Sequence, residues 1–132
     1  MPEVRPLVKT LTVGLVLLAL AAVPPAWATS QASSAEVRFG IAVAKKGLWA
    51  EARFRFEKAV ELDPRNAAAL NNLAVACEQQ GDFGRAREAY EEALKLKPRQ
   101  RHIQQNYDLF READDKRNRK TKEGEGDAAG SR

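Results

Sequence analysis

The sequence predicts an all-α protein made of two 34-residue helix-turn-helix units and a C-terminal capping helix. Residues 33–66 and 67–100 repeat one pattern, and shifting the first copy by 34 brings ten residues of matching size and polarity into register. Apolar residues recur at spacings of three and four in both copies, as in an amphipathic helix, and no stretch alternates as a strand would. Such a period is typical of a helical-repeat solenoid, in which each unit packs on its neighbours.

The ten repeated positions hold small residues, large apolar residues and turn residues. In the first copy they are Phe39, Gly40, Val43, Gly47, Trp49, Ala52, Phe56, Ala59, Leu62 and Pro64. In the second copy they are Leu73, Ala74, Cys77, Gly81, Phe83, Ala86, Tyr90, Ala93, Leu96 and Pro98. The run from Gly81 to Pro98 resembles the tetratricopeptide repeat, a family in which small residues let paired helices approach and aromatic residues fill the space between them. The resemblance covers residues 33–100 and, in part, 101–113.

Two residues depart from the family pattern. Glu36 stands where the family often has a bulky apolar residue, and Cys77 stands where it often has Tyr. Cys77 is also the only cysteine, so no disulfide can form within the chain. Its register position faces the seam between helices, where a free cysteine packs as a small hydrophobic side chain. We expect it to be buried and unreactive.

Five helices are predicted, at about residues 35–46, 49–62, 67–80, 83–97 and 101–113. Gly47 and Gly81 are expected to end the first helix of each unit, because glycine readily takes the left-handed conformation that follows a helix. Asn66 and Asp82 are candidate N-caps for the third and fourth helices. The fifth helix has one apolar and one polar side, as expected of an element that covers the end of a repeat array. Residues 35–113 therefore form the predicted repeat domain.

The N-terminal residues 1–28 have the layout of a secretory signal. Two early basic residues precede an uncharged, largely apolar run at 11–23, and Pro24-Pro25 and Ala26-Trp27-Ala28 follow. Cleavage after Ala28 would make Thr29 the first residue of the mature chain, with 29–34 as a polar linker. The alternative is an uncleaved N-terminal anchor, because the uncharged stretch continues to residue 35.

The layout resembles bacterial signals, so we expect the repeats outside the cytoplasm. With cleavage, the protein would be periplasmic or secreted. With a retained anchor, it would be a single-pass membrane protein whose repeats lie outside the cytoplasm.

The C-terminal residues 114–132 are predicted to form a disordered, charged tail. No apolar side chain larger than Ala occurs there, so the segment cannot bury enough surface to offset its loss of conformational entropy. Residues 116–122 are locally basic, and we interpret them as a solvated run; the alternative is contact with anionic lipid or another polyanion.

The sequence contains no pattern that indicates catalysis. The single histidine, His102, has no Cys, Asp or Glu at metal-ligand spacing, and no nucleophile–base set or phosphate-binding glycine loop is present. We therefore predict no catalytic residue, no cofactor and no metal site. The net charge of +4 comes from 22 basic and 18 acidic residues that interleave along the repeats, so a nucleic acid is not an expected partner.

The resemblance implies a concave groove lined by the first helix of each unit, where a peptide or protein partner would bind. Register positions two, five, nine, twelve and thirteen are expected to face it, and position two holds Ser34, Ala68 and His102. The predicted partner-binding residues are Val37, Ile41, Lys45, Asn71, Asn72, Val75, Gln105 and Leu109. Apolar residues at position nine form a ladder, and the two asparagines can hold a peptide backbone. The alternative is that the ladder packs within the superhelix and binds nothing.

Some family members clamp a C-terminal carboxylate with Lys and Asn on the first groove helix, Asn on the second and two basic residues on the third. Those places here hold Val37, Ile41, Asn72, His102 and Asn106. Only Asn72 matches, so the resemblance does not imply a carboxylate clamp. An apolar groove with amide edges favours an amphipathic helix or an extended peptide.

These observations lead to two functional hypotheses. The first is a small exported adaptor that binds a protein or peptide through an apolar concave groove. The alternative is a membrane-tethered or self-associating structural subunit of an envelope assembly, in which another copy fills the groove of a homo-oligomer.

Overall fold

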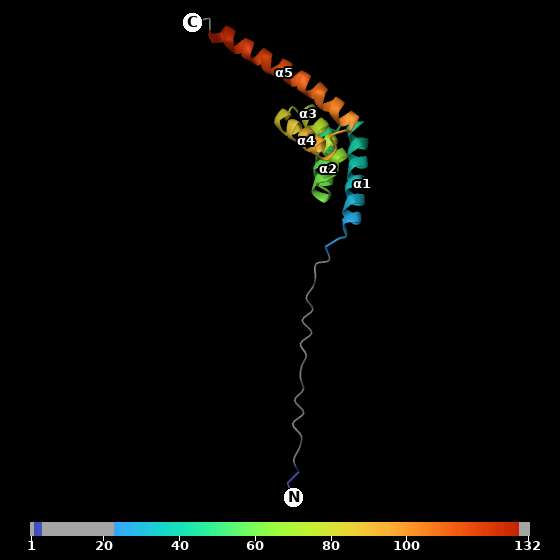
Figure 1. Cartoon of the computed structure of the whole chain (residues 1–132). Helices are drawn as coiled ribbons and strands as arrows, with labels where there is room; N and C mark the ends of the chain where they lie inside the picture. The colour runs from blue at the N-terminus through green and yellow to red at the C-terminus, as the bar shows by residue number, and fades with distance from the viewer. Residues whose placement is uncertain (1, 4–22, 130–132) are drawn as a thin grey trace.

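The computed structural model describes residues 2–3 and 23–129, and this part of the chain contains five helices and no strand. They are α1 (Ala26–Ala44), α2 (Trp49–Leu62), α3 (Ala67–Gln79), α4 (Phe83–Leu96) and α5 (Arg101–Ala129) (Figure 1). α1 packs on α2 and α3 packs on α4, so each pair forms one helix-turn-helix unit. The second helix of the first unit contacts the first helix of the next, and α5 packs on α4. The all-α repeat architecture is therefore confirmed.

The turn inside each unit depends on a glycine. Gly47 and Gly81 both have a φ of 77°, and no other described residue has a positive φ. That conformation costs a residue with a side chain about 1–2 kcal/mol. Asn66 and Asp82 begin α3 and α4 as predicted. Each side chain accepts a hydrogen bond from the backbone N–H three residues later, at 3.1 and 3.3 Å respectively.

The core of each unit holds one large aromatic side chain between two helices. Phe56 on α2 and Tyr90 on α4 are both buried, and they are equivalent residues in the repeat. Phe56 leaves room only for glycine on the facing helix, since a Cβ atom at Gly40 would lie 2.5 Å from the Phe56 ring. The equivalent residue on α3, Ala74, is also fully buried. Small residues thus let the paired helices approach, as expected.

The repeat array ends at α5, because two positions that hold glycine or alanine in the earlier units hold aspartate in α5. The residue equivalent to Gly40 and Ala74 is Asp108, an exposed carboxylate on which a further helix could not pack closely. The residue equivalent to the turn glycines is Asp115. Without a glycine there, α5 does not turn back and continues as one long helix that projects away from the four-helix body (Figure 1).

The structure contradicts the predicted linker at 29–34. These residues lie within α1, because Ser33 belongs to the buried interior of the first unit. The Ser33 hydroxyl donates a hydrogen bond of 2.7 Å to the carbonyl oxygen of Ala59 and accepts one of 2.9 Å from the Asn66 side chain. The polar composition of residues 29–34 therefore gave no indication that Ser33 packs in the interior of the first unit.

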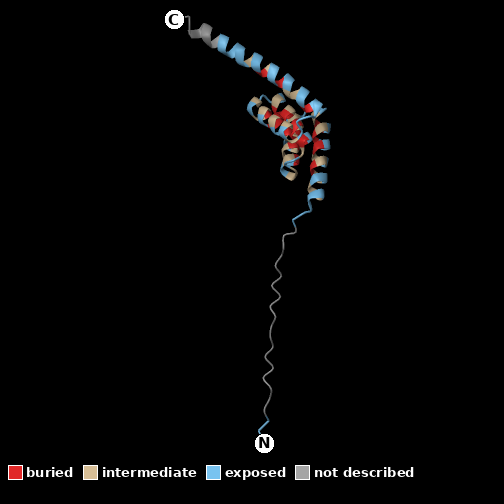
Figure 2. Ribbon diagram, viewed as in Figure 1, coloured by how far each residue is buried: buried red, intermediate tan, exposed pale blue. Residues whose placement is uncertain are grey.

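The structure also contradicts the prediction of disorder from Asp114 onward, since residues 114–129 are helical. Asp114 is buried and pairs with Arg87 of α4 and with Arg117. The Arg117 guanidinium lies 3.6 Å from the centroid of the Phe83 ring. The prediction considered only apolar side chains and missed a paired carboxylate and an arginine stacked on an aromatic ring. Residues 118–123 are exposed along the projecting part of α5 (Figure 2).

Most of the predicted signal, residues 1 and 4–22, lies outside the described residues. The predicted cleavage motif, Ala26 to Ala28, forms the first turn of α1. Among the helices of the described residues, none combines the length and apolar character that a membrane crossing requires.

Candidate functional site

An apolar cavity of about 200 Å³ opens between α1, α2 and α3. Its lining residues are Ile41, Ala44, Lys45, Trp49, Phe56, Asn72 and Val75. Four of them, Ile41, Lys45, Asn72 and Val75, are residues that the sequence predicted for the groove. Ile41 and Val75 are half-buried, because one side of each packs on the core and the other faces the cavity.

Two polar side chains border this apolar cavity. The Asn72 amide nitrogen donates a hydrogen bond of 2.8 Å to the carbonyl oxygen of Ala68. Its side-chain oxygen accepts no hydrogen bond from any described residue, so it can accept one from a peptide N–H. Lys45 is exposed and, within the described part of the chain, has no carboxylate within 4 Å. The cavity therefore combines an apolar interior with polar groups at its mouth, an arrangement that can orient a bound chain.

The structure contradicts the groove prediction for Val37 and Asn71, which share register position five. Val37 is buried and packs with Ala69 of α3. Asn71 is also buried, and its side-chain oxygen accepts a hydrogen bond of 3.1 Å from Asn106 of α5. Position five therefore lies in the seam between consecutive first helices, where it is covered by the next one and cannot meet a partner.

The two predicted residues on α5 are exposed but do not line the apolar cavity. Gln105 occupies the same register position as Val37, and it is exposed because, within the described residues, no further first helix packs beside α5. Leu109 is 66% exposed. The expected ladder of Ile41, Val75 and Leu109 thus contributes two side chains to the apolar cavity, and the third lies outside it.

A second cavity, of about 330 Å³, lies between α1 and the amino-terminal ends of α3 and α5. Its lining residues are Ser30, Ser34, Asp63, Arg65, Asn66, Ala67, Ala68, Lys97, Gln100, His102 and Ile103. Register position two contributes Ser34, Ala68 and His102 from three successive first helices. We call this space the loop-end cavity, because the loops before α3 and α5 supply most of its polar groups.

None of the residues that line the loop-end cavity was among the predicted partner-binding residues. Position two was expected to face the groove, but its side chains are small or polar and do not by themselves indicate a binding site. The signal that could have found the site is the pair of basic residues, Arg65 and Lys97, in the loops that precede two groove helices.

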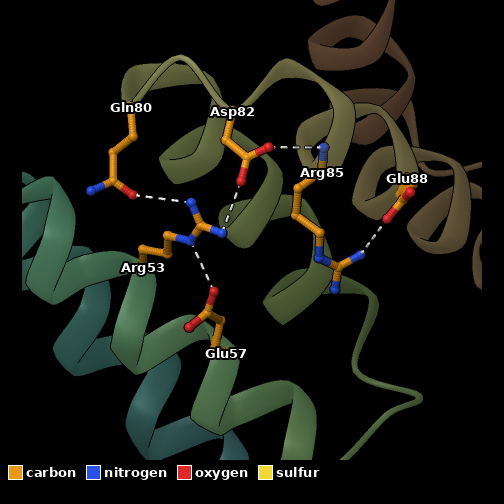
Figure 3. Close-up of polar contacts among 6 residues, drawn as sticks. All are labelled: Arg53, Glu57, Gln80, Asp82, Arg85 and Glu88. Atoms are coloured by element: carbon orange, nitrogen blue, oxygen red, sulfur yellow. Dashed lines mark hydrogen bonds and ion pairs between the residues drawn. The ribbon is translucent and has the colours of Figure 1, made fainter.

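A network of charged side chains holds the two units together at the end where the turn glycines lie (Figure 3). Arg53 of α2 pairs with Glu57 at 2.8 Å and with Asp82 of the next unit at 3.0 Å. Arg53 also donates a longer hydrogen bond of 3.5 Å to Gln80. Each exposed ion pair contributes little to stability. The pair between Arg53 and Asp82 links the two units at this end, in addition to the packing of α2 on α3.

Residues 37–101 match a model of the family described as "Tetratricopeptide repeat". The match begins within α1, includes α2 to α4 and ends at the first residue of α5. Residues 37–101 are tetratricopeptide repeats. No curated protein matches the sequence of the chain. Tetratricopeptide repeats are generally protein–protein interaction modules and are typically non-catalytic, so protein partners are the general expectation for this chain.

Two ionisable side chains are buried between the helices of the second unit. Cys77 is fully buried, as predicted, and burial raises the pKa of its thiol, which keeps it protonated and a poor nucleophile. Burial also raises the pKa of the Tyr90 hydroxyl, which donates a hydrogen bond of 3.3 Å to Glu78. Among residues 2–3 and 23–129, no three His, Cys, Asp or Glu side chains are grouped so that they could hold a metal ion.

Proposed function

We propose that this protein is a small exported adaptor that binds a protein or peptide through the groove formed by its tetratricopeptide repeats. The observation that carries the proposal is the apolar cavity between α1, α2 and α3, with Trp49 and Phe56 in its lining and Asn72 at its edge. A volume of about 200 Å³ is smaller than the roughly 300–1,000 Å³ of typical small-molecule sites. It suits one bulky apolar side chain of a partner.

Such a contact can supply useful binding free energy. Burying one Leu, Ile or Phe side chain contributes about 1.5–3 kcal/mol. A tryptophan in the wall of a desolvated pocket is a frequent source of binding energy at protein interfaces, and Trp49 occupies that place here. The free oxygen of Asn72 would accept a backbone hydrogen bond from the same partner segment.

The binding proposal is tested by capture of partners from the envelope fraction of the native host. Ile41→Asp and Val75→Asp each place a carboxylate in the apolar cavity, and the penalty for desolvating that charge should abolish capture. Ala50→Asp is the matched control, because it adds the same charge at an exposed position in the first turn of α2. Circular dichroism should show unchanged helix content in all three variants. Capture that survives both cavity substitutions would refute the proposal.

Export is supported by the sequence of residues 1–28 alone. We propose that the signal is removed after Ala28 and that the mature protein is periplasmic or secreted. The intact mass of protein from the native host should then correspond to a chain that starts at Thr29. Recovery of the full-length chain in the membrane fraction would contradict cleavage and support the alternative of a single-pass membrane anchor.

One observation favours the alternative of a self-associating subunit. Phe39 is 49% exposed and Phe54 is 54% exposed on the first unit, with the Arg55 guanidinium 4.4 Å from the Phe39 ring centroid. A repeat array usually needs a polar outer face at each end, and these rings are apolar. If they form a contact between copies, sedimentation velocity should show concentration-dependent association that a Phe39→Ser, Phe54→Ser variant lacks. A monomer at every concentration would exclude this alternative.

A further inference from the structure

The loop-end cavity is lined by more basic than acidic side chains, and its Arg and Lys form no ion pair with any group in the described structure. Arg65 and Lys97 line the cavity, and within residues 2–3 and 23–129 neither has a carboxylate within 4 Å. The one acidic lining residue, Asp63, instead accepts a hydrogen bond of 3.0 Å from the backbone N–H of Arg65. Two cationic side chains thus face one carboxylate, and both are available to an anionic ligand.

The backbone adds donors to the same cavity. Ala67 and Ala68 are the first two residues of α3, and neither N–H donates a hydrogen bond within the described structure. The N–H of His102, at the second residue of α5, is equally free of described acceptors. Unpaired N–H groups at a helix start, together with the helix dipole, favour a negatively charged group. The hydroxyl of Ser34 can donate a further hydrogen bond.

The loop-end cavity and the apolar cavity lie along the same helix. Ser34 lines the first and Ile41 lines the second, and they are seven residues apart on α1. At 1.5 Å per residue this separation is about 10 Å along the helix axis. An extended peptide advances about 3.3 Å per residue. Groups three to five residues apart in an extended chain span about 10–17 Å and can reach both cavities, and a separation of four places both side chains on the same side of the strand.

We infer that the partner segment is an extended peptide with a carboxylate in the loop-end cavity and a bulky apolar side chain in the apolar cavity, three to five residues apart. The inference rests on the proposed groove function and adds the chemistry of the ligand. Arg65 and Lys97 pair with the carboxylate, and the free N–H groups of Ala67 and Ala68 hydrogen-bond to it. These groups come from the loops and helix starts, so the arrangement differs from the carboxylate clamp that the sequence does not support.

The probes are short synthetic peptides with one Phe and one Glu at separations from one to eight residues, blocked at both ends. Binding to the protein isolated from its host is followed by nitrogen–proton NMR, in which Trp49 reports the apolar cavity and Ala67 and Ala68 report the loop-end cavity. Affinity should be highest at separations of three to five. Replacing Glu by Gln should weaken binding about fivefold, and added salt should remove most of that difference.

The variant Arg65→Ala, Lys97→Ala should bind the Glu peptide as weakly as the native protein binds the Gln peptide. Lys95→Ala, Arg99→Ala removes the same charge from exposed residues outside the cavity, and it should bind like the native protein. A peptide with Gln for Glu and a free C-terminal carboxylate at the same distance distinguishes a terminal carboxylate from a side-chain one as the source of the charge. Recovery of the lost affinity would show that a terminal carboxylate can replace the side-chain carboxylate in the cavity.

Equal binding of the Glu and Gln peptides, or no change at Ala67 and Ala68, would overturn the inference. That outcome is separable from failure of the groove itself. If Trp49 still responds to Phe and Ile41→Asp still abolishes partner capture, the groove function stands and only the carboxylate contact is lost. If no peptide shifts the Trp49 signal, both the groove function and the carboxylate contact are refuted.

Discussion

At the scale of single residues, the repeat depends on a close contact between one glycine and one aromatic ring. Gly40 faces the Phe56 ring so closely that a Cβ atom would lie 2.5 Å from it, and the ring is buried among core side chains. Gly40→Ala should therefore lower the free energy of unfolding by about 1–3 kcal/mol, as overpacked cores do. Urea unfolding of the purified protein measures it.

The matched control for this substitution is Gly84→Ala. Gly84 lies within α4, and nothing lies within 4 Å of the Cβ atom that alanine would add. Alanine is the better helix former, so this change should stabilise the protein by about 0.5–1 kcal/mol. If both substitutions destabilise equally, the contact between Gly40 and Phe56 is not what sets the spacing of α1 and α2.

The two equivalent core aromatics should be similarly important. Phe56→Ala and Tyr90→Ala each remove a buried ring from the space between two helices. Each should cost on the order of 3 kcal/mol of unfolding free energy, because the cavity cannot collapse completely. Near-neutral values for both, in the same urea experiment, would show that the repeat register is wrong.

Tyr90 also makes stability depend on pH. Burial is the main cause that raises the pKa of its hydroxyl, and the nearby Glu78 carboxylate adds to the shift. In the unfolded chain the hydroxyl ionises near pH 10, whereas in the folded protein it stays protonated to higher pH. Its contribution is thus present below pH 10 and is lost as pH rises above 10. Thermal melts between pH 8 and 11 should show this loss, and Tyr90→Phe should reduce it; an unchanged pH profile would contradict the assignment.

At the scale of helices, the sequence predicted most of the boundaries because they depend on local backbone chemistry. The turn glycines, Gly47 and Gly81, and the caps, Asn66 and Asp82, were identified from residue type alone. The extension of α1 and α5 was not, because both depend on contacts between distant residues. Ser33 is held by a carbonyl group from α2 and an asparagine before α3, and no local pattern reveals this.

The same distinction explains which site residues the sequence located. Ile41 and Val75, at position nine, line the apolar cavity, because the direction of an apolar residue on a groove helix follows from the helical period. The prediction that Val37 and Asn71, at position five, face the groove was wrong, because both are buried. Their burial depends on how far consecutive first helices rotate toward each other. That rotation is a property of the packed array and has no signature in one repeat.

Asp114 is expected to hold the projecting helix on the repeats. It pairs with Arg87 of α4 and with Arg117 of its own helix. Asp114→Asn keeps the shape but removes the charge, leaving Arg87 without its described partner, and it should cost about 1–3 kcal/mol. Hydrogen exchange should rise at residues 111–120, while the amides of 101–106 stay protected.

The control is Asp115→Asn, which changes an exposed carboxylate one residue further along α5 that makes no ion pair with a described residue. It should leave hydrogen exchange at 111–120 unchanged. Equal exchange in the two variants would mean that the apolar contacts of Phe110, rather than the charge on Asp114, hold α5.

At the scale of the whole molecule, the two-unit array is short and is closed by a helix that cannot accept another hairpin. Two cavities of different chemistry lie along its first helices, one apolar and one rich in donors and positive charge. The exposed end of α5 lies apart from the four-helix body (Figure 2). Removing residues 119–132 should therefore leave partner capture unchanged. Loss of capture after this truncation would indicate that the partner binds the basic run at residues 116–122 and not the groove.

The groove is tested most directly by methyl and nitrogen–proton NMR of the protein as a captured partner is added. The account predicts that the methyl groups of Ile41 and Val75 and the indole N–H of Trp49 shift together, because all three line the apolar cavity. The backbone N–H signals of Phe39 and Phe54, whose exposed rings do not line that cavity, should stay in place. Shifts confined to those two residues or to residues 118–123, with Ile41 and Val75 unchanged, would contradict binding in the groove.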